Sequence, residues 1–394
     1  MHQSPGHVPS ASRFSMGPLA GVTAALTMFG AAQGLSYPLF TILMQRQGLS
    51  PAAIGLSAAM MPLGLVLSAS LVPLAVRHVG ARTLAVSCAL LAALCFLLIG
   101  WLQNWIAWYV LRLVLGFIVN PLYILGEVWA LALADPARRG RTMGIFNAVM
   151  GIGYAAGPLA LAAVGTAGWP PFLVGIVGFV VCAGVLAAVS RNLSGFEARE
   201  GETTGGFFWF ASIAPALLIA VGVAAAAQQS TYSLMPVFGK SYGLAEATLA
   251  ALITGLSVGN IILQIPLGLA AERLGGRAMI IVCALATAVC AVLLPMTIGT
   301  LAVWPVLVVM GGVGYGVYTM ALVELGDRFN GASLVAGNAA FALMWGVGGI
   351  VGPPGAGAAM EVFGPLGLPA VIGALSLGLV TFALYRTASR NRRQ

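Results

Sequence analysis

Charged residues are scarce in this chain. Of its 394 residues, eighteen are Lys or Arg, ten are Asp or Glu and three are His, so that only 7% are charged. A soluble globular domain carries about 25% charged residues. A water-soluble protein of this length would need much more polar surface, so the composition excludes that class.

Motifs of several function classes are missing as well. No nucleotide-binding loop of the GxxxxGK[ST] type occurs, which excludes an ATP-driven pump built from this chain alone. His2, His7 and His78 fall in a tail or a loop and form no plausible Ser/His/Asp set. The five cysteines lie inside apolar runs without a CxxC or Cys/His cluster, and no clustered basic face indicates nucleic-acid binding. We therefore expect no enzymatic activity, no cofactor, no metal and no nucleic-acid partner.

Apolar residues make up 60% of the chain, and the mean hydropathy is +1.00. The apolar runs are continuous and rich in Ala, Leu, Val and Gly, which favours helices over the alternating strands of a membrane barrel. The sequence predicts an all-α membrane protein with twelve transmembrane helices of about 20 residues or more. The expected spans are 17–44, 51–76, 81–101, 104–133, 141–165, 170–190, 207–235, 245–270, 277–298, 302–326, 335–361 and 366–386.

The polar stretches divide the chain. Its first fifteen residues lack the features of a secretory signal. The predicted parts are an N-terminal tail (1–16), a six-helix half (17–190), a linker (191–206), a second six-helix half (207–386) and a basic C-terminal tail (387–394).

Basic residues predict the orientation of the spans. Fifteen of the eighteen fall in the tails and in alternate loops, whereas the opposite loops carry only Arg46 and Lys240, and Arg112 is inside a span. The positive-inside rule then places both termini and the linker in the cytoplasm. We expect a monomer whose partners are the lipid bilayer, of a bacterial inner membrane, and a small-molecule substrate.

The two halves repeat each other. A shift of 195 residues places Tyr37 on Tyr232, Gln33 on Gln228, Cys88 on Cys283, Gly116 on Gly311 and Gly157-Pro158 on Gly352-Pro353, without a gap. Six spans per half return the chain to its starting side, so the halves have the same orientation. Secondary transporters use such parallel repeats, with the substrate site between the halves at the membrane midplane.

Three motifs carry a family resemblance. The segment from Gly268 to Arg277 resembles the cytoplasmic loop signature of the major facilitator superfamily, Arg112-x-x-x-Gly116 resembles its span-4 element, and Gly153-x-x-x-Gly157-Pro158 resembles the element described for exporters. The first loop signature is degraded, because Pro73 and Arg77 replace its Gly and its acid. The resemblance covers essentially the whole chain and implies the twelve-helix fold and alternating access. It is closest to poorly characterised bacterial members and brings no substrate with it.

The loop signatures supply candidate gating residues. Glu272 at a helix end could accept hydrogen bonds from the next helix and pair with a nearby Arg, which would hold the cytoplasmic side shut. The alternative is a loop whose charges only set the topology. In the first half, an acid from elsewhere, such as Glu127 or Glu324, could face Arg77. The candidate gating residues are Arg77, Arg82, Glu272, Arg273, Arg277, Glu324 and Asp327.

Arg112 and Glu127 are the charges expected inside a span. Arg112 is about 12 Å deep at 1.5 Å per residue, where a charge is a functional candidate. It could anchor an anionic substrate group or hold a proton-coupling carboxylate, or it could be a structural Arg bonded to carbonyls and tyrosines. Glu127 is a candidate proton-coupling site, the alternative being an ion pair with Arg139 or Arg141. Near the external ends, Glu246 and Glu361 are expected to be solvated.

Polar side chains recur at helical spacing on the spans that line the central cavity in this family. They form either a wet cavity wall or hydrogen bonds between helices. The candidate substrate-binding residues are Gln33, Tyr37, Arg112, Asn120, Tyr123, Gln228, Tyr232, Tyr315 and Tyr318, with Asn147, Asn338 and Trp345 as weaker candidates.

The Gly-Pro elements permit close helix approach and bending. They comprise Gly153, Gly157, Pro158, Gly348, Gly352 and Pro353. The first copy favours export slightly, although packing alone explains both copies. The leading hypothesis is a secondary transporter of a small organic solute, driven by the proton gradient. The alternatives are uptake or exchange of an organic anion held by Arg112 and, more remotely, a non-transporting sensor or an enzyme.

Overall fold

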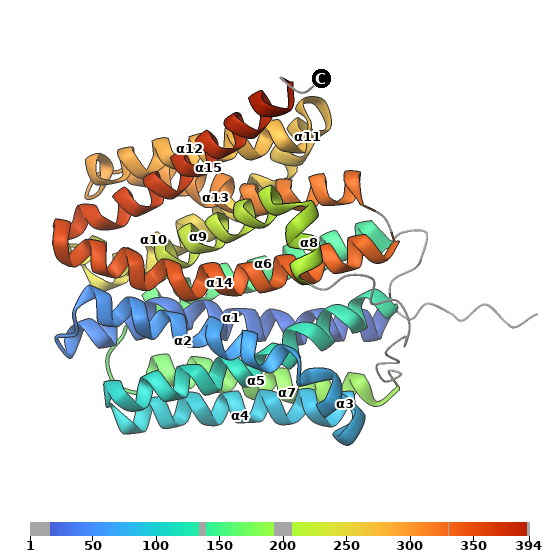
Figure 1. Cartoon of the computed structure of the whole chain (residues 1–394). Coiled ribbons are helices and arrows are strands. Elements are labelled where there is room, and N and C mark those ends of the chain that lie inside the picture. The colour runs from blue at the N-terminus through green and yellow to red at the C-terminus, as the bar shows by residue number, and fades with distance from the viewer. Residues whose placement is uncertain (1–15, 134–138, 193–206, 330, 392–394) are drawn as a thin grey trace, which may run out of the picture.

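The computed structural model describes residues 16–133, 139–192, 207–329 and 331–391. Every regular element in these ranges is a helix (Figure 1). The expected all-α fold is therefore confirmed. The expected linker at 193–206, residues 1–15 and residues 392–394 lie outside the described ranges.

The first half contains α1 (Met16–Arg46), α2 (Pro51–Ala69), α3 (Val72–Val79), α4 (Ala81–Leu102), α5 (Trp105–Leu133), α6 (Arg139–Val164) and α7 (Pro170–Val189). The second half contains α8 (Phe207–Ile213), α9 (Pro215–Ser241), α10 (Glu246–Ile262), α11 (Gln264–Leu274), α12 (Gly276–Thr297), α13 (Val303–Arg328), α14 (Gly331–Phe363) and α15 (Gly367–Asn391). Short 3-10 turns at Ser190–Asn192 and Gly364–Leu366 follow α7 and α14.

Ten stretches of the described chain are long and apolar enough to cross a membrane, or eleven if the bent pair α10 and α11 is one span. One of the ten, Ala336–Arg386, has 51 residues and runs through both α14 and α15. A straight helix of that length would measure about 76 Å, against about 30 Å for the hydrocarbon core. It is therefore two crossings, and the count agrees with the twelve spans expected from the sequence.

Three expected spans are broken, and prolines explain the breaks. The expected span 51–76 divides into α2 and α3, because Pro73 has no amide hydrogen to donate to the Ala69 carbonyl. Pro266 likewise cannot donate a hydrogen bond to the Ile262 carbonyl, and α10 and α11 meet at 43°. Pro215 starts α9, so the expected span 207–235 was wrong at both ends.

The backbone repeats with the sequence. Gly80 precedes α4 with φ 80° and ψ 148°, and its match Gly275 precedes α12 with φ 83° and ψ 149°. Side chains other than glycine rarely adopt this conformation. The same turn therefore connects the second and third spans of each half.

Matched glycines also bring matched helices together. A Cβ at Gly157 on α6 would lie 2.3 Å from the Ala31 carbonyl oxygen on α1, and a Cβ at Gly352 on α14 would lie 2.5 Å from the Ala226 carbonyl oxygen on α9. Ala31 and Ala226 are themselves 195 residues apart. The backbones of α1 and α6, and of α9 and α14, therefore approach too closely for any side chain.

The halves meet along four central helices and α6 with α10. In Figure 1, α4, α5 and α7 lie in the lower part and α12, α13 and α15 in the upper part, with α1, α2, α9 and α14 between them. The main packing across the halves is between α2 and α14, between α6 and α10 and between α1 and α9.

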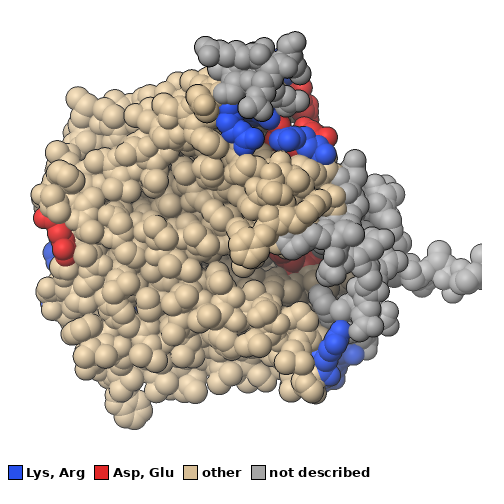
Figure 2. All heavy atoms as spheres, in the orientation of Figure 1, with Lys and Arg blue, Asp and Glu red and all other residues tan. Residues whose placement is uncertain are grey.

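The two ends of the bundle differ in charge. Arg77, Arg82, Arg273, Arg277 and Arg328 lie at one end, called here the arginine-rich end, whereas Arg46 and Lys240 lie at the opposite end. Figure 2 shows this asymmetry, with a recess between the upper and lower parts at the arginine-rich end and acidic atoms visible inside it.

A single added methyl group tests the close approach of α14 to α9. We expect Gly352→Ala to lower stability by about 1–3 kcal/mol through overpacking against Ala226. Gly355 on the same helix has open space around its Cβ position, so Gly355→Ala is the matched control. Because alanine favours helix by about 0.8–1 kcal/mol over glycine, the control should be neutral or stabilising. Thermal unfolding of both variants in detergent measures the difference, and equal melting temperatures would contradict the packing role.

Candidate functional site

The two tyrosines that the repeat matches meet between the halves. Tyr37 lies on α1 and Tyr232 on α9, and their ring centroids are 6.1 Å apart with the planes at 71°. The Tyr232 hydroxyl is 3.1 Å from the Ser257 hydroxyl on α10. The pair thus lies at the interface of the halves, where a repeat with one orientation places matched residues opposite each other.

Gln33 and Gln228 lie one turn before these tyrosines. Gln33 is fully buried, with its amide nitrogen 4.0 Å from the Met61 sulfur. The side-chain carbonyl oxygens of both glutamines are buried and have no hydrogen-bond partner among the described residues. Such unsatisfied acceptors cost about 1–3 kcal/mol each, so a hydroxyl, amine or water reaching them would be bound favourably.

The polar residues of α5 have different surroundings. Asn120 donates a hydrogen bond of 3.1 Å to the Leu65 carbonyl on α2. This bond occupies the Asn120 amide within the first half. Tyr123 packs edge-on against Phe29 of α1 with centroids 4.7 Å apart. Both side chains are half-buried. Asn120 therefore ties two helices together, and Tyr123 is the more available wall residue.

An aromatic cluster lies on α13 and α14 of the second half. Tyr315 and Tyr318 on α13 have ring centroids 5.4 Å apart, and Trp345 on α14 lies 5.8 Å from the first and 4.8 Å from the second. All three side chains are half-buried. We refer to Tyr315, Tyr318 and Trp345 as the aromatic cluster. Asn338 of α14 is exposed, as is Asn147 of α6.

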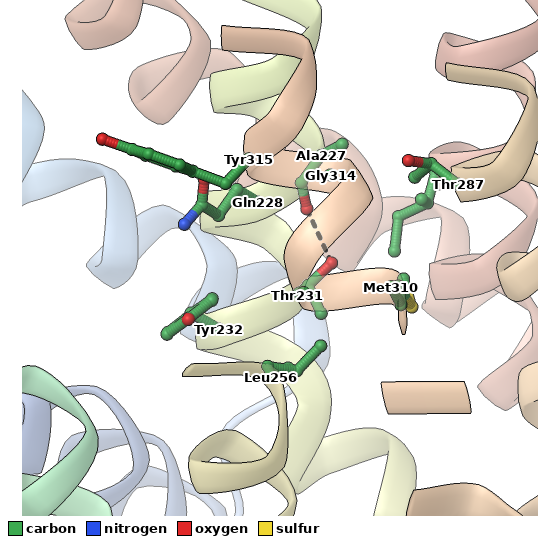
Figure 3. Close-up of a pocket in the computed structure, with 11 residues that line it drawn as sticks. Ala227, Gln228, Thr231, Tyr232, Leu256, Thr287, Met310, Gly314 and Tyr315 are labelled. Carbon is green, nitrogen blue, oxygen red and sulfur yellow. Dashed lines mark hydrogen bonds between the residues drawn. The ribbon is translucent and has the colours of Figure 1, made fainter. Parts of the chain in front are cut away.

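A small pocket extends from Tyr315 into the second half. Gln228, Tyr232 and Tyr315 lie on its central side, while Thr287 of α12 and Met310 of α13 lie opposite (Figure 3). The Thr231 hydroxyl donates to the Ala227 carbonyl and Thr287 to Cys283, so both hydroxyls are already used. The pocket therefore offers Gln228 and Tyr315 as its available polar groups.

Arg112 is enclosed. It is 2% exposed, donates a hydrogen bond of 3.1 Å to the Ser57 hydroxyl on α2, and its guanidinium carbon lies 5.1 Å from the centre of the Phe40 ring on α1. Its Nε has no hydrogen-bond partner among the described residues. No acidic side chain within the described ranges pairs with it, so Arg112 is held by a hydroxyl and an aromatic ring.

Glu127 is open. Its side chain is exposed although it lies six residues, about 9 Å, before the end of α5. It is within electrostatic range of Tyr315 and Tyr318 on α13 of the second half, and of Tyr123 one turn before it on α5. No described residue forms an ion pair or hydrogen bond with it. The alternative partners expected from the sequence are Arg139 and Arg141, whose side chains the structure does not describe.

The opposite end is closed by a cluster that the sequence did not suggest. Arg46 at the end of α1 donates through Nε to Glu246 at the start of α10 over 2.9 Å, and through a terminal nitrogen to the Thr166 carbonyl over 2.9 Å. The Thr166 hydroxyl also bonds Glu246. We call Arg46, Thr166 and Glu246 the rim cluster. The expectation that Glu246 is merely solvated was therefore wrong.

Two further hydrogen bonds join the halves at this end. Thr41 of α1 donates to the Ser233 carbonyl of α9 over 2.7 Å, and the Ala52 amide of α2 donates to the Glu361 carboxylate of α14 over 3.3 Å. Glu361 thus also has a partner. In the sequence, the signal for the rim cluster was the isolated charge of Arg46, because a lone charge in an apolar loop favours a partner.

At the arginine-rich end, the ion pairs among described residues stay within the second half. Glu324 lies 3.8 Å from Arg277 and 3.6 Å from Arg328. Glu324 thus pairs with Arg277 and Arg328, both in its own half. Arg82 donates to the Ala187 carbonyl of α7 over 2.8 Å. Glu272, Arg273 and Asp327 are exposed.

Glu246→Gln tests the rim cluster, because glutamine keeps the acceptor oxygen and removes the charge. An exposed ion pair contributes up to about 1 kcal/mol, so we expect the population open at the rim to rise about fivefold or less. Spin labels at Asn104 and Thr300, one on each half, report that opening by electron resonance. Added 1 M salt, with a screening length of about 3 Å, should have the same effect on the wild type and little on the variant. Equal distance distributions in both proteins would refute the role of the pair.

Comparisons with known proteins agree with this architecture. The sequence profile described as Major Facilitator Superfamily matches residues 22–211 and 217–394. The uncharacterized MFS-type transporter YfkF of Bacillus subtilis is 25% identical over 351 residues, which cover 86% of this chain and 87% of that protein. The uncharacterized MFS-type transporter YcaD of Salmonella arizonae is 28% identical over 124 residues, about a third of each chain.

Solved structures share the fold. A mutant of the nucleoside transporter NupG matches with a TM-score of 0.78 at 13% identity, over 93% of this chain and 99% of that one. A bacterial homologue of the human lysosomal transporter Spinster, in an inward-facing unoccupied conformation, matches with a TM-score of 0.72 at 14% identity, over 95% and 96%. The chain therefore belongs to the Major Facilitator Superfamily of membrane transporters and is not an enzyme.

Proposed function

We propose that this protein is a proton-coupled secondary transporter that exports a small organic solute by alternating access. We place both termini in the cytoplasm, because most basic residues lie at the end that carries the termini. We further propose a monomer in a bacterial inner membrane.

The contacts between the halves support alternating access. The rim cluster, the Thr41–Ser233 hydrogen bond and the Tyr37–Tyr232 contact join the halves from the opposite end to the middle. At the arginine-rich end, no ion pair between the halves is found among the described residues, and a recess opens there (Figure 2). With cytoplasmic termini, this arrangement is the inward-open state of such a transporter.

Proton coupling is supported by Glu127, an exposed carboxylate without a described ion-pair partner. A carboxylate at membrane depth is expensive and tends to mark a proton or substrate pathway. Glu127 is exposed near the arginine-rich end of α5 and has no described cationic partner. A proton reaching it from the recess would remove the cost of the charge. Export is favoured slightly by the first Gly-Pro element, although both copies also pack helices.

The second candidate is uptake or exchange of an organic anion. It is favoured by Arg112, whose Nε is buried without a partner among the described residues. Its enclosure against Phe40 and Ser57 weighs against it, because an anion would first have to displace these contacts. Arg112→Ala that transports with unchanged affinity would remove this candidate.

Flux into proteoliposomes under an imposed pH gradient tests the coupling. Across a panel of drugs, sugars, amino acids and carboxylates, we expect proton-driven flux of one class in the wild type. Glu127→Gln should abolish the proton-driven component, by at least about tenfold, while solute exchange without a gradient persists. Glu361→Gln, which keeps an acceptor for the Ala52 amide, is the matched control. Proton-driven flux that survives in Glu127→Gln would show that the coupling site lies elsewhere.

A further inference from the structure

The membrane-depth charges of α5 have no counterparts in the second half. A shift of 195 residues places Arg112 on Leu307 and Glu127 on Leu322. Tyr123, by contrast, matches Tyr318, so the wall opposite Glu127 keeps the aromatic character and lacks the charge. The central space is therefore asymmetric, with a carboxylate on the first half facing tyrosines on the second.

Glu127 forms no ion pair or hydrogen bond with any residue that the structure describes. Arg112 is fifteen residues away on the same helix, about 22 Å along its axis, and is enclosed by Phe40 and Ser57. At the arginine-rich end, Arg277 and Arg328 pair with Glu324, and Arg82 donates to the Ala187 carbonyl. A proton satisfies the carboxylate, and so does a cationic ligand.

The aromatic cluster selects the kind of cation. Tyr315 and Tyr318 lie within electrostatic range of Glu127, and the Trp345 indole packs edge-on against both. Faces of Trp and Tyr attract ammonium groups within about 6 Å, most strongly when water is excluded. Inorganic cations keep their water instead and gain little from such a wall. The combination of one carboxylate and three half-buried rings suits an ammonium group on an apolar body.

We propose that the space between α5 and the aromatic cluster binds organic cations, with Glu127 contacting the charge and Tyr315, Tyr318 and Trp345 holding the apolar body. This inference rests on the proposed function, because it names the substrate class of the same site. It also accounts for the unsatisfied carbonyl oxygens of Gln33 and Gln228, which are acceptors only and so suit a donor such as a protonated amine.

Three probes with one phenol body separate charge from shape. They are 3-hydroxyphenyltrimethylammonium, neutral 3-tert-butylphenol and 3-hydroxybenzenesulfonate. Equilibrium binding to the full-length protein in nanodiscs, without any gradient, measures each. We expect the cation to bind at least about tenfold more tightly than the neutral probe, and the sulfonate not to bind.

Variants assign the effect to residues. Glu127→Gln should remove the preference for the cation while binding of 3-tert-butylphenol persists, which also shows that the variant is folded. Glu127→Asp should keep the preference. Trp345→Leu should weaken cation binding several-fold, whereas Trp345→Phe, which keeps an aromatic face, should weaken it less. Trp101→Leu is the matched control, since Trp101 is 73% exposed at the far end of α4.

Several results would overturn the proposal. They are equal affinity for the three probes, tighter binding of the sulfonate, absence of cation binding to the wild type, and a cation preference that survives in Glu127→Gln. Tighter sulfonate binding that is lost in Arg112→Ala would establish the anion candidate instead. Because no proton gradient is applied, these outcomes are independent of whether Glu127 couples transport to protons.

Discussion

The cost of a charge in a low-dielectric environment governs the centre of this protein. Two charges lie at membrane depth on α5, and the structure treats them in opposite ways. Arg112 is covered by Phe40 and Ser57, which offer a ring face and a hydroxyl instead of a counter-charge. Glu127 is left open toward the second half. A charge without a fixed partner is unstable in this setting, and such instability lets a proton or a ligand change the energy of the site.

Glycines without a side chain allow the helices around this centre to pack closely. Gly157 and Gly352 let α6 and α14 approach α1 and α9 at backbone distance. Across the halves, α1 packs against α9, and the Tyr37 and Tyr232 rings lie edge to face there. The same residues in both copies perform the same packing, which explains why the Gly-Pro elements are duplicated. Their duplication therefore says more about the architecture than about the direction of transport.

Much of the fold could be predicted from the sequence, because apolar runs and a repeat in one register are strong signals. The helix count, the shared orientation of the halves and the matched turns at Gly80 and Gly275 follow from them. The broken spans were missed because a proline in an apolar run does not change its hydropathy. Pro73 and Pro266 interrupt helices that composition alone reads as continuous.

The candidate site was predictable in part for a similar reason. Helical spacing brought out Gln33 with Tyr37, but not the partners of Glu246, since Arg46 lies 200 residues away in the chain and on the other half. Likewise, the sequence allowed a pair between Glu324 and Arg77. In the structure, α12 packs against α13, and Glu324 pairs with Arg277. Contacts between distant loops depend on which half each charge belongs to, and spacing carries no such information.

The placement of the ion pairs is compatible with the alternating access proposed above. At the rim, one exposed pair and a few hydrogen bonds join the halves, and exposed pairs contribute little. At the arginine-rich end, the pairs of Glu324 lie within one half, so a movement of the halves relative to each other leaves them intact. Among the residues that the structure describes, the charged contacts between the halves are therefore limited to the rim. In the proposed mechanism, a proton on Glu127 removes a charge whose cost at membrane depth is on the order of a few kcal/mol, and this shifts the balance between the two ends.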